Sequence, residues 1–137
     1  MTRGFPMQIN AVATLDVAPA NPDYFTGGVA IRRMFQAEGD SRLSGLQVTF
    51  QPKARTAWHT HPVGQTLIVT EGAGRVQVRG GAVITVVAGD IVRFAAGEEH
   101  WHGAAPDVSM THLALQEEVD GSAADWLDHV TDAEYDG

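Results

Sequence analysis

The sequence predicts a single all-β domain, built as a sandwich or a barrel. Fifteen glycines and six prolines separate short runs that are rich in Val, Ile and Thr. Several runs alternate apolar and polar residues, which is the pattern of a strand with one buried face. The 137 residues are enough for one domain with a hydrophobic core, and no internal repeat, linker or low-complexity tract divides them.

Composition narrows the possible partners. Apolar residues make up 44 % of the chain and charged residues 19 %, as in soluble globular proteins. The 17 acidic and 9 basic residues give a formal net charge of −8, which argues against nucleic acid and anionic membrane as partners. There is no cysteine, so any metal must be held by imidazole, carboxylate or amide. Residues 1–20 lack a long apolar run, so we expect neither a signal peptide nor a membrane span, and a cytoplasmic location is the default.

The first expected strands lie in the amino-terminal part of the chain. Residues 29–35, near the end of "PDYFTGGVAIRRMFQ", are expected to form an edge strand. Residues 45–51, "GLQVTFQ", alternate strictly. Leu46, Val48 and Phe50 therefore fall on one face of a strand, and the polar residues between them fall on the other.

Further strands are expected wherever short apolar runs are bounded by turn residues. Four such runs follow one another: 66–70, 75–79, 83–87 and 91–94. A Glu-Gly-Ala-Gly turn is expected between the first two of them. A late strand, 109–117, places four residues on one of its faces: Met110, His112, Ala114 and Gln116.

Only the carboxyl-terminal segment has helical spacing. Residues 122–130, "SAADWLDHV", bring Trp126, Leu127 and Val130 together at that spacing, with Ser122 as the N-cap. Thr131 and Glu134 then match a capping box, which predicts one more helical turn.

Five of the six histidines lie between positions 59 and 112. In "WHTHPVGQ", His59 and His61 are two residues apart, so on a strand both can face the inside of a barrel. Gln65 keeps the same parity, although Pro62 and Gly64 must bend the chain in between.

A third imidazole can come from "GEEHWH", where His100 and His102 are both available. Imidazole suits Mn, Fe, Co, Ni, Cu and Zn alike, so this spacing predicts a metal site without identifying the ion.

Two segments resemble the two motifs of the cupins. Residues 52–74, "PKARTAWHTHPVGQTLIVTEGAG", resemble the first motif, and residues 89–103, "GDIVRFAAGEEHWHG", resemble the second, although Ala95 stands where the motif has proline. Gly97 and His100 fit the second motif, so the resemblance makes His100 the ligand and not His102. It implies a small jelly-roll β-barrel with a core at about 40–117 and a metal inside.

Further strings are "ARTAWHTHP", "GQTLIVT", "GEEHWHGAAP" and "MTHLALQE", with "YFTG" upstream and "VTDAEY" in the tail. Through them the chain, from about Tyr24 to Tyr135, is similar to small bacterial single-domain cupins that act as hydroxynitrile lyases. Those proteins bind manganese through three histidines and one glutamine. The resemblance implies the same ligand set here, with Mn²⁺ as the expected ion and Fe, Zn, Ni or Co as alternatives: His59, His61, Gln65 and His100. It also implies reversible cleavage of cyanohydrins such as mandelonitrile to an aldehyde and cyanide.

Many cupins have a glutamate at the position of Gln65. An amide oxygen is neutral, so a divalent ion bound by it and by three imidazoles keeps its full charge and is a stronger Lewis acid. Less donor charge also disfavours a higher oxidation state, which argues for chemistry without oxygen activation. In the alternative interpretation, Gln65 hydrogen-bonds a strand end and water completes the ligand shell.

His112 is the candidate general base. If its face of strand 109–117 is the barrel interior, a nearby cation would keep the imidazole neutral and able to accept a proton. The alternative is a core histidine whose hydrogen bonds are satisfied. Gln116, on the same face, could position the leaving anion by hydrogen bonding or could pair with the backbone.

The substrate pocket is expected to be lined by the apolar face of residues 45–51. Leu46, Val48 and Phe50 would contact an aromatic or alkyl group, although Phe50 also suits ordinary core packing. Trp101 and His102 are expected at the rim of the pocket, and His129 at the surface without a role.

Two other functions remain open for such a cupin. One is a different metalloenzyme, such as a dioxygenase, and the other is a module that binds a small molecule without catalysis. The expected assembly is a homodimer or homotetramer that pairs edge strands around 29–35.

Overall fold

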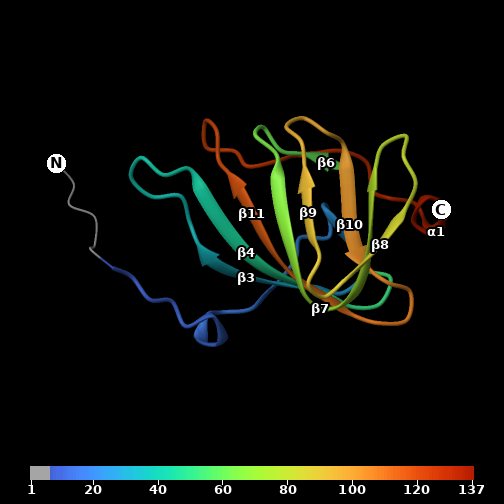
Figure 1. Ribbon diagram of the computed structural model, residues 1–137, viewed down its shortest axis with the longest axis horizontal. Helices are drawn as coiled ribbons and strands as arrows, with labels where there is room; N and C mark the ends of the chain where they lie inside the picture. Colours follow the sequence, from blue (N-terminus) through green and yellow to red (C-terminus); the bar gives the residue numbers. More distant parts are fainter. Residues whose placement is uncertain (1–6) are drawn as a thin grey trace.

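The structure is a computed structural model that describes residues 7–137, a strongly curled antiparallel sheet that ends in a short helix (Figure 1). The elements are, in chain order, η1 (Val12–Thr14), β1 (Ala18–Pro19), β2 (Phe25–Thr26), β3 (Val29–Phe35), β4 (Leu43–Phe50), β5 (Arg55–Thr56), β6 (His59–Thr60), β7 (Gln65–Val78), β8 (Ile84–Val87), β9 (Ile91–Phe94), β10 (His100–Ala104), β11 (Met110–Glu117), β12 (Asp125–Trp126) and α1 (Asp132–Asp136).

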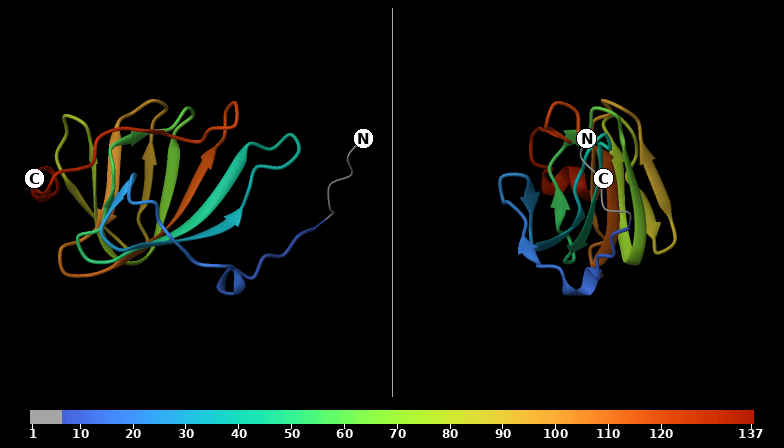
Figure 2. Two further views of the ribbon diagram at one scale, coloured as in Figure 1. Left: turned by 180° about the vertical axis from the view of Figure 1, so that it is seen from behind. Right: turned by 90° about the vertical axis from the view of Figure 1, so that its left-hand side faces the viewer.

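The long strand β7 joins the two layers of the barrel (Figure 2). The strands follow the order β1-β3-β4-β11-β7-β10-β5-β2, and β6, β8, β9 and β12 pair off this path. The first half of β7 pairs with β11 and β9, and its second half pairs with β10 and β8. The expected all-β barrel is therefore confirmed.

The turn expected between residues 70 and 75 is wrong, because β7 runs through these residues without a break. Gly72 has a positive φ of 74°, and a Cβ added there would lie 1.9 Å from the carbonyl oxygen of Ser109. At Gly74 an added Cβ would lie 2.4 Å from the oxygen of Gly103. These glycines let β7 bend from one layer into the other while neighbouring backbone passes close by, so they act inside a strand.

Two clusters of apolar side chains lie on opposite sides of the second layer. The larger fills the barrel interior and includes Phe50, Leu67, Val69, Phe94 and Met110. The smaller lies on the outer side, beneath the chain terminus, and consists of Trp58, Trp101, Val130 and Tyr135.

The helix expected over residues 122–130 is wrong. This segment is extended, and within it β12 pairs with β6 at the barrel mouth. The capping box of Thr131 and Glu134 is confirmed, and it begins the five-residue helix α1. Trp126 and Val130 pack against the barrel from an extended segment while Leu127 stays exposed, and one short stretch of periodicity cannot distinguish this from a helix.

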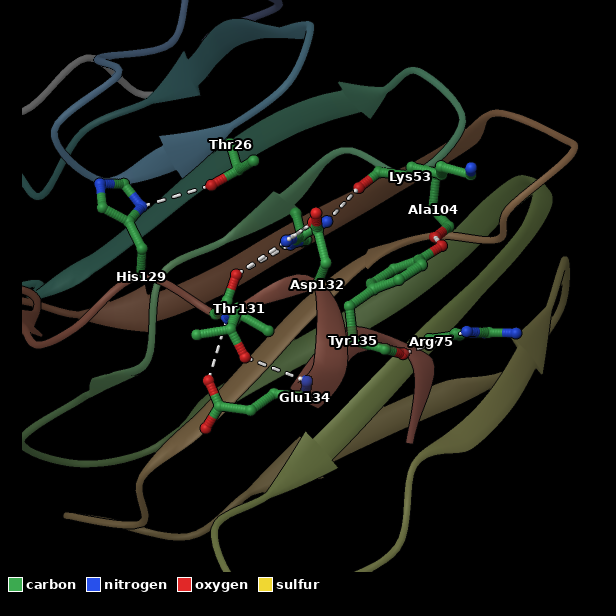
Figure 3. Close-up of polar contacts among 11 residues, drawn as sticks. Thr26, Lys53, Arg75, Ala104, His129, Thr131, Asp132, Glu134 and Tyr135 are labelled. Atoms are coloured by element: carbon green, nitrogen blue, oxygen red, sulfur yellow. Dashed lines mark hydrogen bonds and ion pairs between the residues drawn. The ribbon is translucent and has the colours of Figure 1, made fainter.

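Polar contacts attach α1 to the barrel (Figure 3). The hydroxyl of Tyr135 donates to the carbonyl oxygen of Ala104 over 2.6 Å, and its ring lies under the guanidinium of Arg75. The buried guanidinium of Arg55 donates to the carbonyl oxygen of Val130 and to Asp132, each over 2.8 Å. The last residues of the chain therefore cover the outer side of the second layer.

Residues 7–17, which precede β1, run outside the barrel (Figure 1). The expectation that residues 1–20 contain no signal peptide falls partly on residues 1–6, which lie outside the described residues. Among residues 7–137, none of the helices has the length and apolar composition that crossing a bilayer requires.

Candidate metal centre

Three buried imidazoles converge at one end of the barrel. His59 in β6 and His100 in β10 are paired in register, and the ring of His61 lies 5.0 Å from that of His59. One ring nitrogen of each residue lies within 4.8 Å of the others. The three residues are 1 %, 4 % and 0 % exposed, so the cluster is buried in the barrel, and it can hold a divalent metal.

The outer nitrogen of each imidazole contacts a main-chain carbonyl oxygen. The three contacts, 2.6 to 2.9 Å long, join Nδ1 to oxygen in the pairs His59 and Ala57, His61 and Ala123, and His100 and Glu98. A carbonyl oxygen only accepts, so each Nδ1 carries the proton and donates it. Each Nε2 is then a lone pair, which is the arrangement that backbone partners impose on metal-binding histidines.

Gln65 begins β7, and its side-chain oxygen lies 3.2 Å from Nε2 of His100. Because that Nε2 has no proton, two lone pairs face each other across this gap. Two atoms bound to one ion at right angles, each about 2.1 Å from it, would lie about 3 Å apart. Nε2 of His61 is buried and has no hydrogen-bond partner among residues 7–137. The donor set therefore fits a divalent cation shared by three imidazoles and a neutral oxygen.

The imidazoles of the cluster are neutral at neutral pH. Burial lowers the pKa of His59 well below 6.5, and the neighbouring imidazoles of His100 and His61 lower it further. Burial also lowers the pKa of His61, and it lowers the pKa of His100 to about 4. The neutral imidazole is the form that binds metals, so burial prepares the ligands for an ion.

His112 forms a pair with His102 beside the cluster. Its Nε2 lies 2.9 Å from Nδ1 of His102, and both residues are buried. Nδ1 of His112 and Nε2 of His102 have no hydrogen-bond partner in the described part of the chain. Each neutral imidazole has one N–H and one lone pair, and the contact between the rings uses one of each. The two outer nitrogens therefore keep one N–H and one lone pair between them. Burial lowers the pKa of His112 to about 4, which leaves it neutral and able to accept a proton.

Gln116 lies in β11, two residues after Ala114, and its side chain contacts that of Gln65. Its oxygen accepts a hydrogen bond of 3.2 Å from Nε2 of Gln65. Its own Nε2 lies 3.0 Å from the hydroxyl and 3.3 Å from the carbonyl oxygen of Ser44. One of these contacts reaches the backbone and two reach side chains, and together they hold the Gln116 amide between β4 and β7.

The histidines open into a cavity of about 360 Å³, within the range of small-molecule sites. Predicted pocket residues Leu46, Val48 and His102 line it. Its other apolar lining includes side chains that the sequence did not indicate: Phe25, Ile31, Ala114 and Trp126. Charged residues Arg33 and Glu118 also contribute to the lining, so the cavity has charged groups besides its apolar walls and its histidines.

Two residues expected in the pocket do not line it. Phe50 is fully buried in the interior cluster, where its ring lies 5.3 Å from that of His112, so it supports the pair from behind. Trp101 alternates with His100 and His102 along β10 and therefore faces the opposite side, in the smaller cluster.

The carboxyl-terminal segment contributes to the site although the sequence predicted a helix there. The ring of Trp126 lies 4.6 Å from that of His59, and the oxygen of Ala123 accepts from His61. No periodic signal marks a two-residue strand such as β12, and a backbone oxygen carries no sequence signal. Exposed His129 lies 3.4 Å from the hydroxyl of Thr26, away from the cavity lining.

A curled antiparallel barrel with converging histidines inside defines the class of the protein. Residues 46–115 match the Cupin_2 family, described as a cupin domain. The chain therefore belongs to the cupin family, which confirms the resemblance of its two histidine-containing segments.

Three proteins show which members of the fold the chain is similar to. Over 129 residues, which cover 94 % of this chain and 98 % of the relative, the chain is 54 % identical to an (R)-mandelonitrile lyase from Granulicella tundricola. A solved cupin-like protein from Thermotoga maritima is 40 % identical, with a TM-score of 0.82 over 86 % of this chain and 90 % of that one. The polyketide cyclase RemF from Streptomyces resistomycificus shares the fold at 15 % identity, with a TM-score of 0.73 over 95 % and 91 % of the two chains.

Proposed function

We propose that the protein is a metal-dependent hydroxynitrile lyase, which reversibly cleaves cyanohydrins such as mandelonitrile into an aldehyde and cyanide. The observation that carries this proposal is the neutral His112–His102 pair beside a set of metal-binding donors in one cavity. The 54 % identity to a mandelonitrile lyase supports the same activity. A module that only binds a ligand has less need of a buried base with an unpartnered nitrogen.

The donors of the metal site are His59, His61, His100 and Gln65, and the proposed ion is Mn²⁺. All four are uncharged, so a bound divalent ion keeps its full charge and supplies Lewis-acid polarisation of the substrate hydroxyl. The three imidazoles are held ready for an ion, because their outer nitrogens are already committed to backbone carbonyl oxygens.

The histidine pair moves the proton. The outer lone pair, at Nδ1 of His112 or Nε2 of His102, accepts the hydroxyl proton of the cyanohydrin. The electrons of that O–H bond form the carbonyl, and the carbon–carbon bond breaks with its electron pair leaving on cyanide. Because burial lowers the pKa of His112 to about 4, its protonated ring gives up a proton more readily than an ordinary imidazolium and passes it to cyanide. In the reverse direction the same groups add cyanide to an aldehyde.

The rest of the cavity suits an aromatic aldehyde or cyanohydrin. Leu46 and Val48 on one wall, with Phe25 and Trp126, offer apolar surface next to the histidines. An aryl group bound there is removed from water, while the carbon that carries the substrate oxygen faces the metal donors. This orients the substrate for attack from one side.

The test combines metal analysis with a synthesis assay. Benzaldehyde and cyanide are incubated with the purified protein at mildly acidic pH, and mandelonitrile is resolved by chiral chromatography. We expect one enantiomer in excess, and loss of that product in His112→Ala. Metal-loaded protein that gives no cyanide-dependent product would contradict the proposal, and oxygen consumption with another substrate would favour a dioxygenase.

We also propose that the protein forms a homodimer through β3. β1 pairs only with Ala30 and Ile31, so Arg32–Phe35 has a neighbouring strand on one side alone among residues 7–137. Met7 and Ile9, in the segment that runs outside the barrel, are 76 % and 82 % exposed. A second copy would cover this edge and these apolar side chains. Light scattering after size exclusion distinguishes a monomer from a dimer or tetramer.

A further inference from the structure

We infer that Gln116 is a positioning residue, which works through Gln65 and obliges that amide to present its oxygen, and not its nitrogen, to the metal donors. The inference rests on the metal site proposed above and adds the reason why a glutamine can serve there. An amide has two ends of similar shape, and only one of them can bind a cation. Something must therefore choose between the two orientations.

The choice begins at Ser44, whose carbonyl oxygen can only accept a hydrogen bond. Ser44, Gln116 and Gln65 stand directly opposite one another across β4, β11 and β7. The hydroxyl of Ser44 lies 3.3 Å from the carbonyl oxygen of Gln116 and donates to it, since a carbonyl only accepts. The remaining lone pairs of that hydroxyl and the carbonyl oxygen of Ser44 then face the Gln116 side chain as acceptors.

Gln116 passes this polarity on to Gln65. With two acceptors of Ser44 beside it, the end of Gln116 that lies there must be the nitrogen. Its oxygen then points to Gln65 and needs a donor, which is Nε2 of Gln65 at 3.2 Å. The oxygen of Gln65 is left at the other end, 3.2 Å from Nε2 of His100.

Without this chain of contacts the other orientation would be favoured in the metal-free protein. A flipped Gln65 would place its N–H against the lone pair of His100, which is a good hydrogen bond. That bond would have to break before an ion could bind. Ser44, Gln65 and Gln116 are only 5 %, 7 % and 6 % exposed, so water competes little for these groups and their bonds decide the orientation.

The experiment compares one substitution in two backgrounds. Gln116→Met keeps the length of the side chain and removes its acceptor. Affinity for Mn²⁺ and for Zn²⁺ is measured by competition with a chromogenic chelator on metal-stripped protein. In the native background we expect affinity to fall roughly tenfold to a hundredfold, the range for groups that orient metal ligands. Thr111→Val, which removes a buried hydroxyl that β11 shares with Thr49, is the matched control and should leave affinity unchanged.

The second background is Gln65→Glu. A carboxylate has an oxygen at both ends, so its orientation needs no selection. There we expect Gln116→Met to change metal affinity less than about twofold, in contrast to the native background. The side-chain amide of Gln65 is also followed by ¹⁵N NMR in the metal-free protein. Its hydrogen bond to Gln116 shifts the amide proton resonance, and Gln116→Met should abolish that change in chemical shift.

Equal losses of affinity in both backgrounds would assign Gln116 a general structural role and overturn the inference. An unchanged affinity in the native background would overturn it as well. Neither measurement uses a cyanohydrin, so the outcome of this test does not depend on whether the protein is a lyase.

Discussion

His112 makes the metal-free protein less stable in mild acid, and the size of the effect follows from its burial. Its pKa is lowered from 6.5 to about 4 because the ring is enclosed by the barrel. In the unfolded chain the imidazole protonates as the pH falls below 6.5, whereas in the folded protein it does not. The unfolded state then binds more protons, so the free energy of unfolding decreases over this window.

The magnitude comes from the two pKa values. Their separation, at about 1.4 kcal/mol per pH unit, corresponds to about 3 kcal/mol in total, of which about 2 kcal/mol is lost by pH 5. Urea denaturation of chelator-treated protein at pH 7.5 and pH 5.0 measures this loss. In His112→Leu the difference between the two pH values should be smaller by about 2 kcal/mol, because that variant has no group to protonate at this position.

His129→Leu is the control, since His129 is exposed and removing it leaves the buried histidines in place. Its loss of stability between the two pH values should match that of the native chain. A His112→Leu protein that loses as much stability on acidification as the native chain would show that His112 is not held neutral by burial, and the proton transfer assigned to the pair would lose its basis.

Three further predictions concern the fold and the cavity. Tyr135→Phe removes the hydrogen bond to Ala104 and should lower the free energy of unfolding by about 1 kcal/mol, seen as a lower Tm in thermal denaturation. Gly72→Ala places a Cβ against the oxygen of Ser109 at a positive φ, so it should yield little soluble protein or lose more than about 2 kcal/mol in urea denaturation; a native Tm would contradict the account of β7. Leu46→Trp should fill part of the cavity and reduce kcat/KM for mandelonitrile at least about tenfold, while the affinity for Mn²⁺ stays unchanged.

The parts of the site that the sequence indicated share one property. His59, His61 and Gln65 follow strand parity across a short turn, and parity alone suggested that their side chains face one way. The choice of His100 over His102 came from a motif and not from parity, because both residues lie on the same face of β10. The structure brings the first into the cluster and pairs the second with His112.

The parts that the sequence did not indicate are of another kind. The carbonyl oxygens that fix the imidazoles belong to the backbone, and every residue has one, so no side-chain pattern marks them. The extended course of residues 122–130 depends on β6 and on the face of His59 that Trp126 covers, which are distant in the chain. Trp101 lies outside the pocket because the period of two along β10 places it on the face opposite that of His100 and His102.

The contact between His61 and Ala123 links the ligands to a late part of the chain. All four proposed ligands precede residue 101, so they leave the ribosome well before the residue that orients one of them. A nascent chain that stops after β11 would carry every donor atom, yet His61 would lack its carbonyl partner and His59 its cover from Trp126. The arrival of residues 123–126, and not that of the last ligand, is therefore the event that finishes the site.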